Sequence, residues 1–267
     1  MPFPPTLNIA VRAARRAGAL IMRYLDRLDM VSFAEKSRHD FVTEVDRQSE
    51  RIIIETLRKA YPHHAILAEE SGLHGKDDFQ WIIDPLDGTT NFLHGFPQFA
   101  VSIALRHRGK LDQAVIYDPV RNELFTASQG KGAQLNERRI RVSKVKRADD
   151  ALLGTGFPFR SQQYLDDYLA MFRALFPRVS GIRRAGSAAL DLAFVAAGRL
   201  DGFWEIGLKP WDIAAGALLI QEAGGMIGDF SGGGAFLHTG NVVAGNPTIY
   251  PFVLKTLQPH LPPSLKR

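Results

Sequence analysis

Two aspartates that follow a short apolar run place strong limits on the fold and the chemistry of this chain. Within the stretch Trp81–Asn91, three apolar residues lead to Asp84 and Asp87, which are three positions apart. A proline and an Asp-Gly pair indicate that the chain is turning there. A second apolar run, Ala65–Ala68, is followed by two glutamates. Oxygen ligands at the ends of neighbouring strands suit a hard cation such as Mg²⁺, and turn N–H groups beside them suit a phosphate, which favours metal-assisted phosphoryl transfer to water.

The same residues also have simpler structural interpretations. An Asp-Gly pair is common in turns that bind nothing, so Asp84 and Asp87 could form only a turn. Glu70 could be a solvated charge at the start of the polar segment 70–79. The residues alone leave both alternatives open.

Composition sets broader limits. The 267 residues are 45% hydrophobic, enough for one large domain or two tightly joined halves. The chain has no cysteine, which excludes disulfides and thiolate chemistry and fits a reducing compartment. No apolar run approaches the roughly 20 residues of a membrane helix, and Met1–Pro5 lacks the pattern of a signal peptide. We therefore expect a soluble, cytoplasmic protein with no membrane contact.

Basic residues outnumber acidic ones, with a net charge of +5. They gather in three clusters: Arg12, Arg15 and Arg16; Arg138, Arg139 and Arg141; Lys144, Lys146 and Arg147. Such clusters either attract phosphorylated substrates or nucleic acid, or form solvated faces.

Hydrophobic periodicity predicts a mixed order of elements. Helices are expected over 7–28, with Thr6 as N-cap, and from Thr43 onward, where Thr43 and Asp46 have the spacing of a capping box. Residues 31–42 between them read as a loop or short strands. Strands are expected over 65–68, 80–83, 99–107, 111–117, 123–127 and 133–135, with a hairpin turn at 108–110 and a sheet covered on one face. Further on we expect strands at 151–155, 200–206, 226–229 and 242–244, and helices at 164–176, 187–197 and 211–223. Helices followed by a sheet and then mixed elements predict stacked layers of an α+β or α/β fold.

Two further motifs make the chain recognisable. Trp211–Gly216 runs on to Glu222–Gly225, and Gly186–Ala189 (GSAA) precedes both. Together with Asp84–Thr89, which fits the pattern D-P-hydrophobic-D-G-T/S, they resemble the inositol monophosphatase family over roughly residues 7 to 250. Within that family the bacterial SuhB-type members are the most similar. The resemblance implies a layered α-β-α-β-α sandwich of the sugar phosphatase type. It also implies a single domain over 1–267, with halves at about 1–148 and 149–267 and the site between them.

The resemblance also assigns metal ligands. Glu69, Asp84 and the Leu86 carbonyl would hold one Mg²⁺. Asp84, Asp87 and Asp212 would hold a second, and a third, looser ion is expected near Glu69.

Catalytic roles follow from the same resemblance. Thr89 would hydrogen-bond the attacking water and be oriented by Asp46, while Glu70 helps to place the water. A capping box alone would also explain Asp46, and both roles are compatible. The N–H groups of Gly88 and Thr89 would hold phosphate oxygens, supported by the helix that follows.

Substrate contacts are expected mainly from the second half. Gly186, Ser187 and Ala188 open a helix whose N–H groups could meet a hydroxyl or phosphate, and Arg183 precedes them. Glu205 would accept hydrogen bonds from vicinal hydroxyls, and the metal-site residues Glu69, Leu86, Asp87 and Asp212 would also border the substrate. Lys36 lies in a segment that resembles the family's mobile loop. Capping for Ser187, surface charge for Arg183 and solvation for Lys36 are the alternatives.

Two classes of function follow. The first is a Mg²⁺-dependent, lithium-sensitive phosphatase that hydrolyses inositol monophosphate by a two-metal, activated-water mechanism. Fructose 1,6-bisphosphate, adenosine 3′,5′-bisphosphate and histidinol phosphate are alternative substrates within the superfamily. The second is a binding role in ribosomal RNA synthesis, through RNA polymerase and antitermination factors, which the resemblance to SuhB-type proteins implies. The family resemblance also implies a homodimer.

Overall fold

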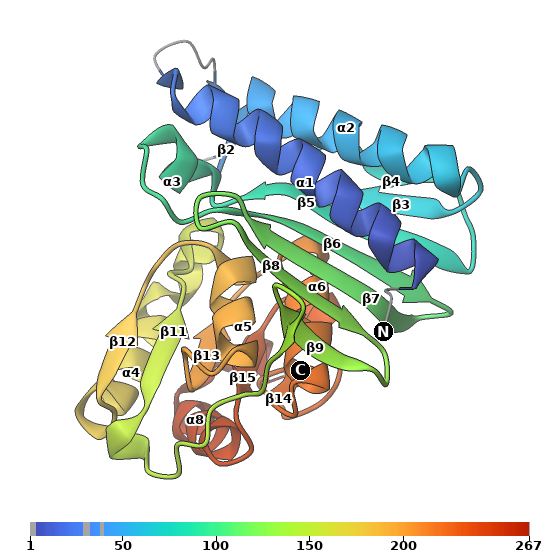
Figure 1. Ribbon diagram of the computed structural model, residues 1–267. Helices are drawn as coiled ribbons and strands as arrows, with labels where there is room; N and C mark the ends of the chain where they lie inside the picture. Colours follow the sequence, from blue (N-terminus) through green and yellow to red (C-terminus); the bar gives the residue numbers. More distant parts are fainter. Residues whose placement is uncertain (1–3, 29–32, 38–39, 267) are drawn as a thin grey trace.

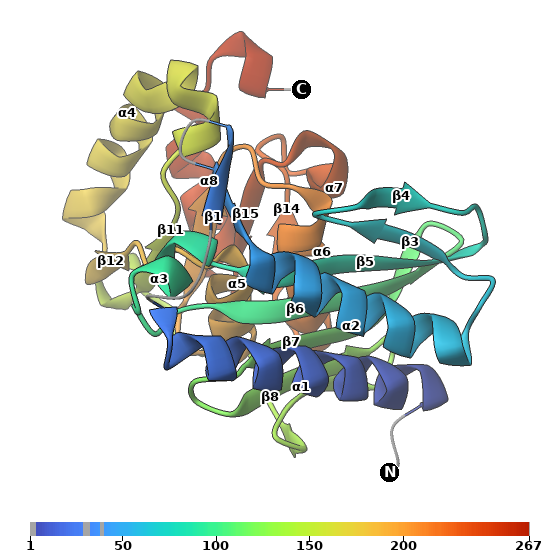
Figure 2. The same ribbon diagram turned by 90° about the horizontal axis from the view of Figure 1, so that it is seen from above.

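Two large β-sheets alternate with three layers of helices in the computed structural model, which describes residues 4–28, 33–37 and 40–266. Helices α1 (Pro5–Leu25) and α2 (Glu44–Ala60) cover the outer face of the larger sheet (Figure 1). Helices α5 (Ala188–Ala196) and α6 (Pro210–Glu222) lie between the two sheets. Helices α4 (Leu165–Leu175) and α8 (Ile249–Leu257) cover the far side of the smaller one. The predicted α-β-α-β-α sandwich is confirmed, and Figure 2 shows α1 and α2 side by side across the sheet.

The larger sheet has the strand order β10-β9-β8-β7-β6-β5-β3-β4. Its strands are β3 (Ala65–Ala68), β4 (Gly72–His74), β5 (Phe79–Asp87), β6 (Ala100–His107), β7 (Lys110–Asp118), β8 (Glu123–Ser128), β9 (Gly132–Leu135) and β10 (Arg138–Arg139). Strands β3 and β5 pair in parallel, so Glu69 emerges beside the carboxyl end of β5. The predicted hairpin between β6 and β7 is present, and Arg108 and Gly109 at its turn both have positive φ.

Large and small apolar side chains alternate along β6 because both faces of the sheet are covered, not one as expected. Val101, Ile103 and Leu105 pack in the core beneath α1 and α2, while Ala100 and Ala104 pack in the core around α5 and α6. The expectation of a sheet covered on one face is therefore wrong. The small side chains face the middle layer because helices approach the sheet closely there.

The smaller sheet has the order β12-β11-β13-β15-β14. Its strands are β11 (Leu152–Thr155), β12 (Gly181–Arg183), β13 (Gly202–Glu205), β14 (Met226–Gly228) and β15 (Val242–Gly245). The sequence patterns indicated all of these except β12, and elsewhere in the chain they missed β4, β10, α7 and α8. A third core, formed by α4, α8 and this sheet, lies on its outer side.

Of the two predicted N-caps, the structure confirms Thr43 and contradicts Thr6. Thr43 caps α2 with the predicted capping box, accepting from the N–H groups of Val45 and Asp46. Helix α1, by contrast, has Pro4 at the N-cap and places Thr6 inside the helix, so that prediction is wrong. Pro5 suits the first helical position because its fixed φ is already helical.

The remaining elements are short. Strands β1 (Phe33–Ser37) and β2 (Asp40–Thr43) pair where a loop or short strands were expected. Lys36 lies in β1, and its side chain is outside the described part of the molecule. The other helical pieces are α3 (Thr89–Leu93), α7 (Phe236–Thr239) and the 3₁₀ turns Ala148–Asp150, Phe159–Tyr164, Phe176–Arg178, Gln258–His260 and Pro263–Leu265. Among the described residues, no helix is both long and apolar enough to cross a bilayer.

Candidate active site

Three carboxylates from two elements meet at the carboxyl end of β5. Asp84 and Asp87 come from β5, and Asp212 comes from the first turn of α6. One carboxylate oxygen from each lies within 4.8 Å of the others, and all three side chains are largely buried. Asp212 is far from the two aspartates of β5 in sequence, and the middle helical layer brings it to them.

The backbone of β5 explains why Asp84 and Asp87 share one cavity. Asp84 pairs with Ser102 on β6 and Asp87 with Ala100, so β5 carries one extra residue between them. This bulge turns the two carboxylates toward the same side, as bulges next to functional sites often do. The Leu86 N–H donates to Asp84 Oδ1 at 3.0 Å and stabilises the bend.

Helix starts fix the other carboxylate oxygens. The Lys209 N–H donates to Asp212 Oδ2 at 2.7 Å, so Asp212 closes the first turn of α6. Ser187 caps α5, accepting from the Leu190 N–H, and its hydroxyl donates to Asp87 Oδ2 at 2.5 Å. The Ala189 N–H donates to the same oxygen at 2.8 Å. The capping and site interpretations of Ser187 are therefore both satisfied.

The three carboxylates are costly to ionise together. Burial, reinforced by Coulomb repulsion from Glu69 and its neighbours, raises the pKa of Asp84 well above its usual range. Burial raises the pKa of Asp87 to about 6 and that of Asp212 to about 7. Arg160, in the 3₁₀ turn after β11, offsets part of this charge. Its guanidinium lies 4.0 Å from both Glu69 Oε1 and Asp212 Oδ2. Clustered hard oxygens that repel one another fit a divalent cation such as Mg²⁺.

Thr89 is positioned by a buried acid from α2. Its Oγ1 lies 3.0 Å from Asp46 Oδ1 and 3.1 Å from the Leu86 carbonyl oxygen, so its single proton can go to either acceptor. Asp46 also accepts from the Thr43 N–H at 2.8 Å and from the Thr43 hydroxyl. Burial raises the pKa of Asp46 to about 6. The capping box thus holds rigidly the acid that orients Thr89.

Gly88 makes the turn that presents Thr89 possible. Its φ is +93°, and a Cβ there would lie 2.8 Å from the Gln98 carbonyl oxygen. Only glycine meets both conditions without strain. The helix that follows, α3, has only five residues, so its dipole adds less to anion binding than a long helix would.

The cavity around these groups has a volume of about 330 Å³ and reaches from β5 to the smaller sheet. The sequence-predicted residues that line it are Glu69, Asp84, Leu86, Asp87, Gly88, Thr89, Gly186, Ser187, Ala188, Glu205 and Asp212. Burial raises the pKa of Glu205 well above its usual range, and a Cβ on Gly156 would clash with the Glu205 carboxylate. Gly156 therefore leaves space for that side chain.

Two predicted residues lie elsewhere. Arg183 is exposed on β12, and its Nη1 donates to the Ile182 carbonyl oxygen at 3.2 Å. Its neighbour Arg184 lines the cavity instead, with its guanidinium over the ring of Phe157 at 5.2 Å. Glu70 lines a separate groove beside α2, and its N–H donates to Glu50 Oε2 at 2.8 Å.

Sequence reasoning also missed several cavity residues. Arg160 and Arg184 lay in stretches without a motif, although Arg184 adjoins the Gly-Ser-Ala-Ala segment. Asp191 is buried on α5, one helical turn after Ser187, and that spacing could have indicated it. The Asn91 amide donates to the carbonyl oxygens of Gln98 at 2.7 Å and Ala185 at 3.0 Å, joining the loops on either side of the cavity.

Known proteins and solved structures resemble this chain over nearly its whole length. The model of the inositol monophosphatase family matches residues 4–261. The Nus factor SuhB of Pseudomonas aeruginosa is 61% identical over 269 residues, covering 98% of this chain and 99% of that protein. The crystal structure of the extragenic suppressor protein SuhB from Bartonella henselae has a TM-score of 0.93 and 46% identity, covering 96% of this chain and 99% of that one. The inositol monophosphatase from Anabaena has a TM-score of 0.86 and 41% identity, covering 96% of each chain. The chain therefore belongs to the inositol monophosphatase family.

Proposed function

We propose that this chain is a Mg²⁺-dependent phosphomonoester hydrolase that converts myo-inositol monophosphate and similar polyol monophosphates to the free polyol and phosphate. Its family supports phosphatase activity. The observation that carries the proposal is the meeting of Asp84, Asp87 and Asp212 within 4.8 Å at the floor of a 330 Å³ cavity. Buried carboxylates this close favour a bound cation because each one repels the others.

The donor set suits magnesium. Glu69, Asp84, Asp87, Asp212 and the Leu86 carbonyl would hold two ions, and Glu69 would contribute to a third, looser one. When bound, the ions would acidify a water and stabilise charge on the leaving oxygen. Lithium is expected to inhibit.

Thr89 would orient the attacking water. Asp46 accepts the Thr89 hydroxyl proton at 3.0 Å, so the lone pairs of that hydroxyl are available to a water in the cavity. Asp46 is held in turn by Thr43, which limits its freedom to turn away. Because Glu70 lines a different groove, we assign this role to Thr89 rather than to Glu70.

Phosphate and polyol would occupy opposite ends of the cavity. The N–H groups of Gly88 and Thr89 lie in the turn beside the carboxylates and would donate to phosphate oxygens. Glu205 and Asp191 line the end near the smaller sheet and would accept hydrogen bonds from hydroxyl groups. Ala188 opens α5 beside them and would donate its N–H to the substrate.

Phosphate release from inositol 1-phosphate tests the proposal. Turnover is expected with Mg²⁺, and it should stop with a chelator and fall with added lithium. Asp84→Asn is expected to lower turnover by about 100-fold or more, because a carboxylate at the centre of the cluster is lost. Asp166→Asn, an exposed change of equal charge on α4, is the matched control. Mg²⁺-independent turnover, or no turnover on inositol, fructose and nucleotide phosphates, would refute it.

A second role is supported by the name of the Pseudomonas relative, a Nus factor. We propose that the chain also associates with RNA polymerase or antitermination factors in ribosomal RNA synthesis. Affinity capture from cell extract, with and without ribonuclease, should retain those proteins. Asp87→Asn should abolish turnover yet keep the complex, and loss of both would show that one site serves the two roles.

We further propose a homodimer, which light scattering coupled to gel filtration would detect.

A further inference from the structure

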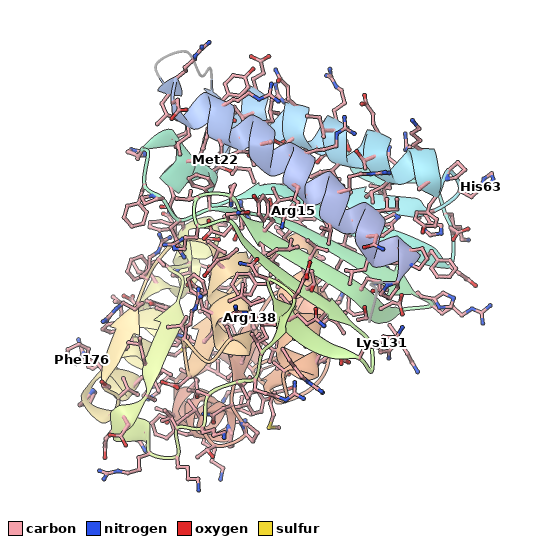
Figure 3. All side chains as sticks on the ribbon, viewed as in Figure 1. Arg15, Met22, His63, Lys131, Arg138 and Phe176 are labelled. Atoms are coloured by element: carbon pink, nitrogen blue, oxygen red, sulfur yellow. The ribbon has the colours of Figure 1, made fainter. Side chains whose placement is uncertain are left out.

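A strip of exposed cations, here called the basic ridge, runs along residues 131–146. It consists of Lys131, Arg138, Arg139, Arg141, Lys144 and Lys146, all of them exposed. Glu137 is the one acid within these residues, so the segment carries a net charge of +5, equal to that of the whole chain. In Figure 3 the labelled Lys131 and Arg138 lie on the green part of the ribbon, at the edge of the larger sheet.

The ridge is held in place although much of it is neither helix nor strand. The Ile140 N–H donates to the Ala133 carbonyl oxygen at 3.0 Å, and the Val142 N–H donates to that of Ala223 at 3.2 Å. The Asn246 amide donates to Ser143 Oγ at 2.8 Å and to the Val145 carbonyl oxygen at 3.0 Å. Ile140, Val142 and Val145 pack against the cores. Apolar side chains thus anchor the backbone while the cations face solvent. The backbone of the ridge therefore needs little further ordering when a ligand binds.

The ridge cations lack the acidic partners that some other surface cations have among the described residues. Arg108 pairs with Asp78 at 2.9 Å, and Arg199 pairs with Glu123 at 2.5 Å. No ion pair joins any ridge cation to an acid within the part of the chain that the structure describes. Glu222 contacts the same segment, but its two oxygens accept from the N–H groups of Gly130 and Gly132, each at 2.7 Å. The positive field of the ridge therefore reaches solvent.

We propose that the basic ridge binds the phosphodiester backbone of a nucleic acid. Arg139, Arg141, Lys144 and Lys146 follow one another at intervals of two or three residues, so their charges are closely spaced along the segment. A polymer with regularly spaced phosphates can engage such a row at several points, whereas a small phosphate ester can engage only one or two. The net charge of +5 on the ridge is larger than the negative charge of one phosphate ester.

The composition of the ridge also indicates how it binds. Residues 131–146 include no aromatic side chain on which a base could stack. Contacts to phosphates position a nucleic acid but carry no sequence information. Binding should therefore be insensitive to base sequence and strongly dependent on salt. None of the ridge residues lines the catalytic cavity, so this inference does not depend on the phosphatase proposal.

Fluorescence anisotropy with a labelled RNA hairpin, and with the DNA hairpin of the same sequence, tests the proposal. The dissociation constant is expected to be about 10⁻⁴ to 10⁻⁶ M at physiological salt, and the logarithm of the association constant should fall with log salt with a slope of about −3 to −5. The triple variant R139Q/R141Q/K144Q should bind at least about 10-fold more weakly, with a slope closer to zero by about 2 to 3.

The matched control is R12Q/R23Q/R51Q, which removes the same charge from exposed positions on α1 and α2. Both triple variants should keep the phosphatase activity and the unfolding midpoint of the unmodified protein, which separates a binding defect from misfolding. Equal binding of RNA and DNA, or tighter binding of RNA through its 2′-hydroxyls, would each support the proposal. An equal loss in both variants, no salt-dependent binding, or equally tight binding of polyglutamate would overturn it.

Discussion

Replacing Asp212 by asparagine is expected to stabilise the metal-free protein above neutral pH. Burial and the repulsion from Asp87 raise the pKa of Asp212 to about 7, from the usual 3.8. Each pH unit corresponds to about 1.4 kcal/mol, so the ionised carboxylate costs up to about 4 kcal/mol at about pH 8. This cost is shared among coupled carboxylates. We therefore expect the neutral amide to raise the free energy of unfolding by about 2–4 kcal/mol. The asparagine oxygen can still accept from the Lys209 N–H, so the helix start is kept.

The sign of the pH dependence follows from proton binding. Between about pH 4 and pH 7 the folded metal-free protein holds protons on Asp87 and Asp212 that the unfolded chain releases. The free energy of unfolding therefore falls as pH rises through this range, and Asp212→Asn should make that decline shallower. Mg²⁺ should stabilise the unmodified protein more at about pH 8 than at about pH 5, because it competes with protons for the same oxygens.

Thermal unfolding of both proteins in the presence of a chelator, at about pH 5 and about pH 8, measures the stability difference directly. A gain of 2–4 kcal/mol corresponds to roughly 4–7 °C for a chain of this size. The same variant should lose most of the stabilisation that Mg²⁺ gives the unmodified protein. Asp166→Asn, an exposed change of equal charge, should leave both quantities nearly unchanged. If Asp212→Asn unfolds at a lower temperature than the unmodified protein at about pH 8 without metal, the argument from carboxylate repulsion is refuted.

Four further predictions concern the site and the fold. Gly88→Ala should cost about 1–2 kcal/mol of stability and most activity, seen in chemical denaturation and turnover, because its φ is +93° and its Cβ would meet Gln98. Thr89→Val should lower kcat by about 100-fold or more with little change in KM, since the lost hydroxyl acts on the water rather than on the polyol. Arg160→Gln should tighten Mg²⁺ binding several-fold in a metal titration and raise KM, because the guanidinium competes with the metal for the carboxylates and would attract the substrate phosphate. The halves 1–148 and 149–267 should unfold in one transition, coincident by near- and far-ultraviolet circular dichroism, because both contribute to the core around α5 and α6; two separate transitions would contradict this.

Local signals in the sequence predicted most of the fold. The capping box of Thr43 and Asp46 and the apolar strand Ala65–Ala68 appear where the patterns put them. The missed strands β4, β10 and β12 have two or three residues each, too few for a hydrophobic period to show. All three are edge strands, held by pairing with a neighbour rather than by their own pattern.

The candidate site was predictable where its residues lie together in sequence. Asp84, Asp87 and Thr89 belong to one turn, and the motif names them together. Arg160 could not be found in this way, because its carboxylate partners lie just after β3 and on α6, about 50 to 90 positions away along the chain. Choosing between Arg183 and Arg184 needs the path of the chain after β12, since adjacent side chains on an extended backbone point to opposite sides.

The middle helical layer connects the core to the chemistry. Helices α5 and α6 are buried on nearly all sides, so their positions are set by both sheets at once. A Cβ on Gly216 of α6 would lie 2.4 Å from Leu192 Cβ of α5, so the two helices pack at a distance that only glycine permits. Their first turns hold Asp212 and, through Ser187, Asp87. A substitution at the contact between these helices, such as Gly216→Ala, would therefore move two of the three clustered carboxylates, although Gly216 itself lies in the contact with Leu192.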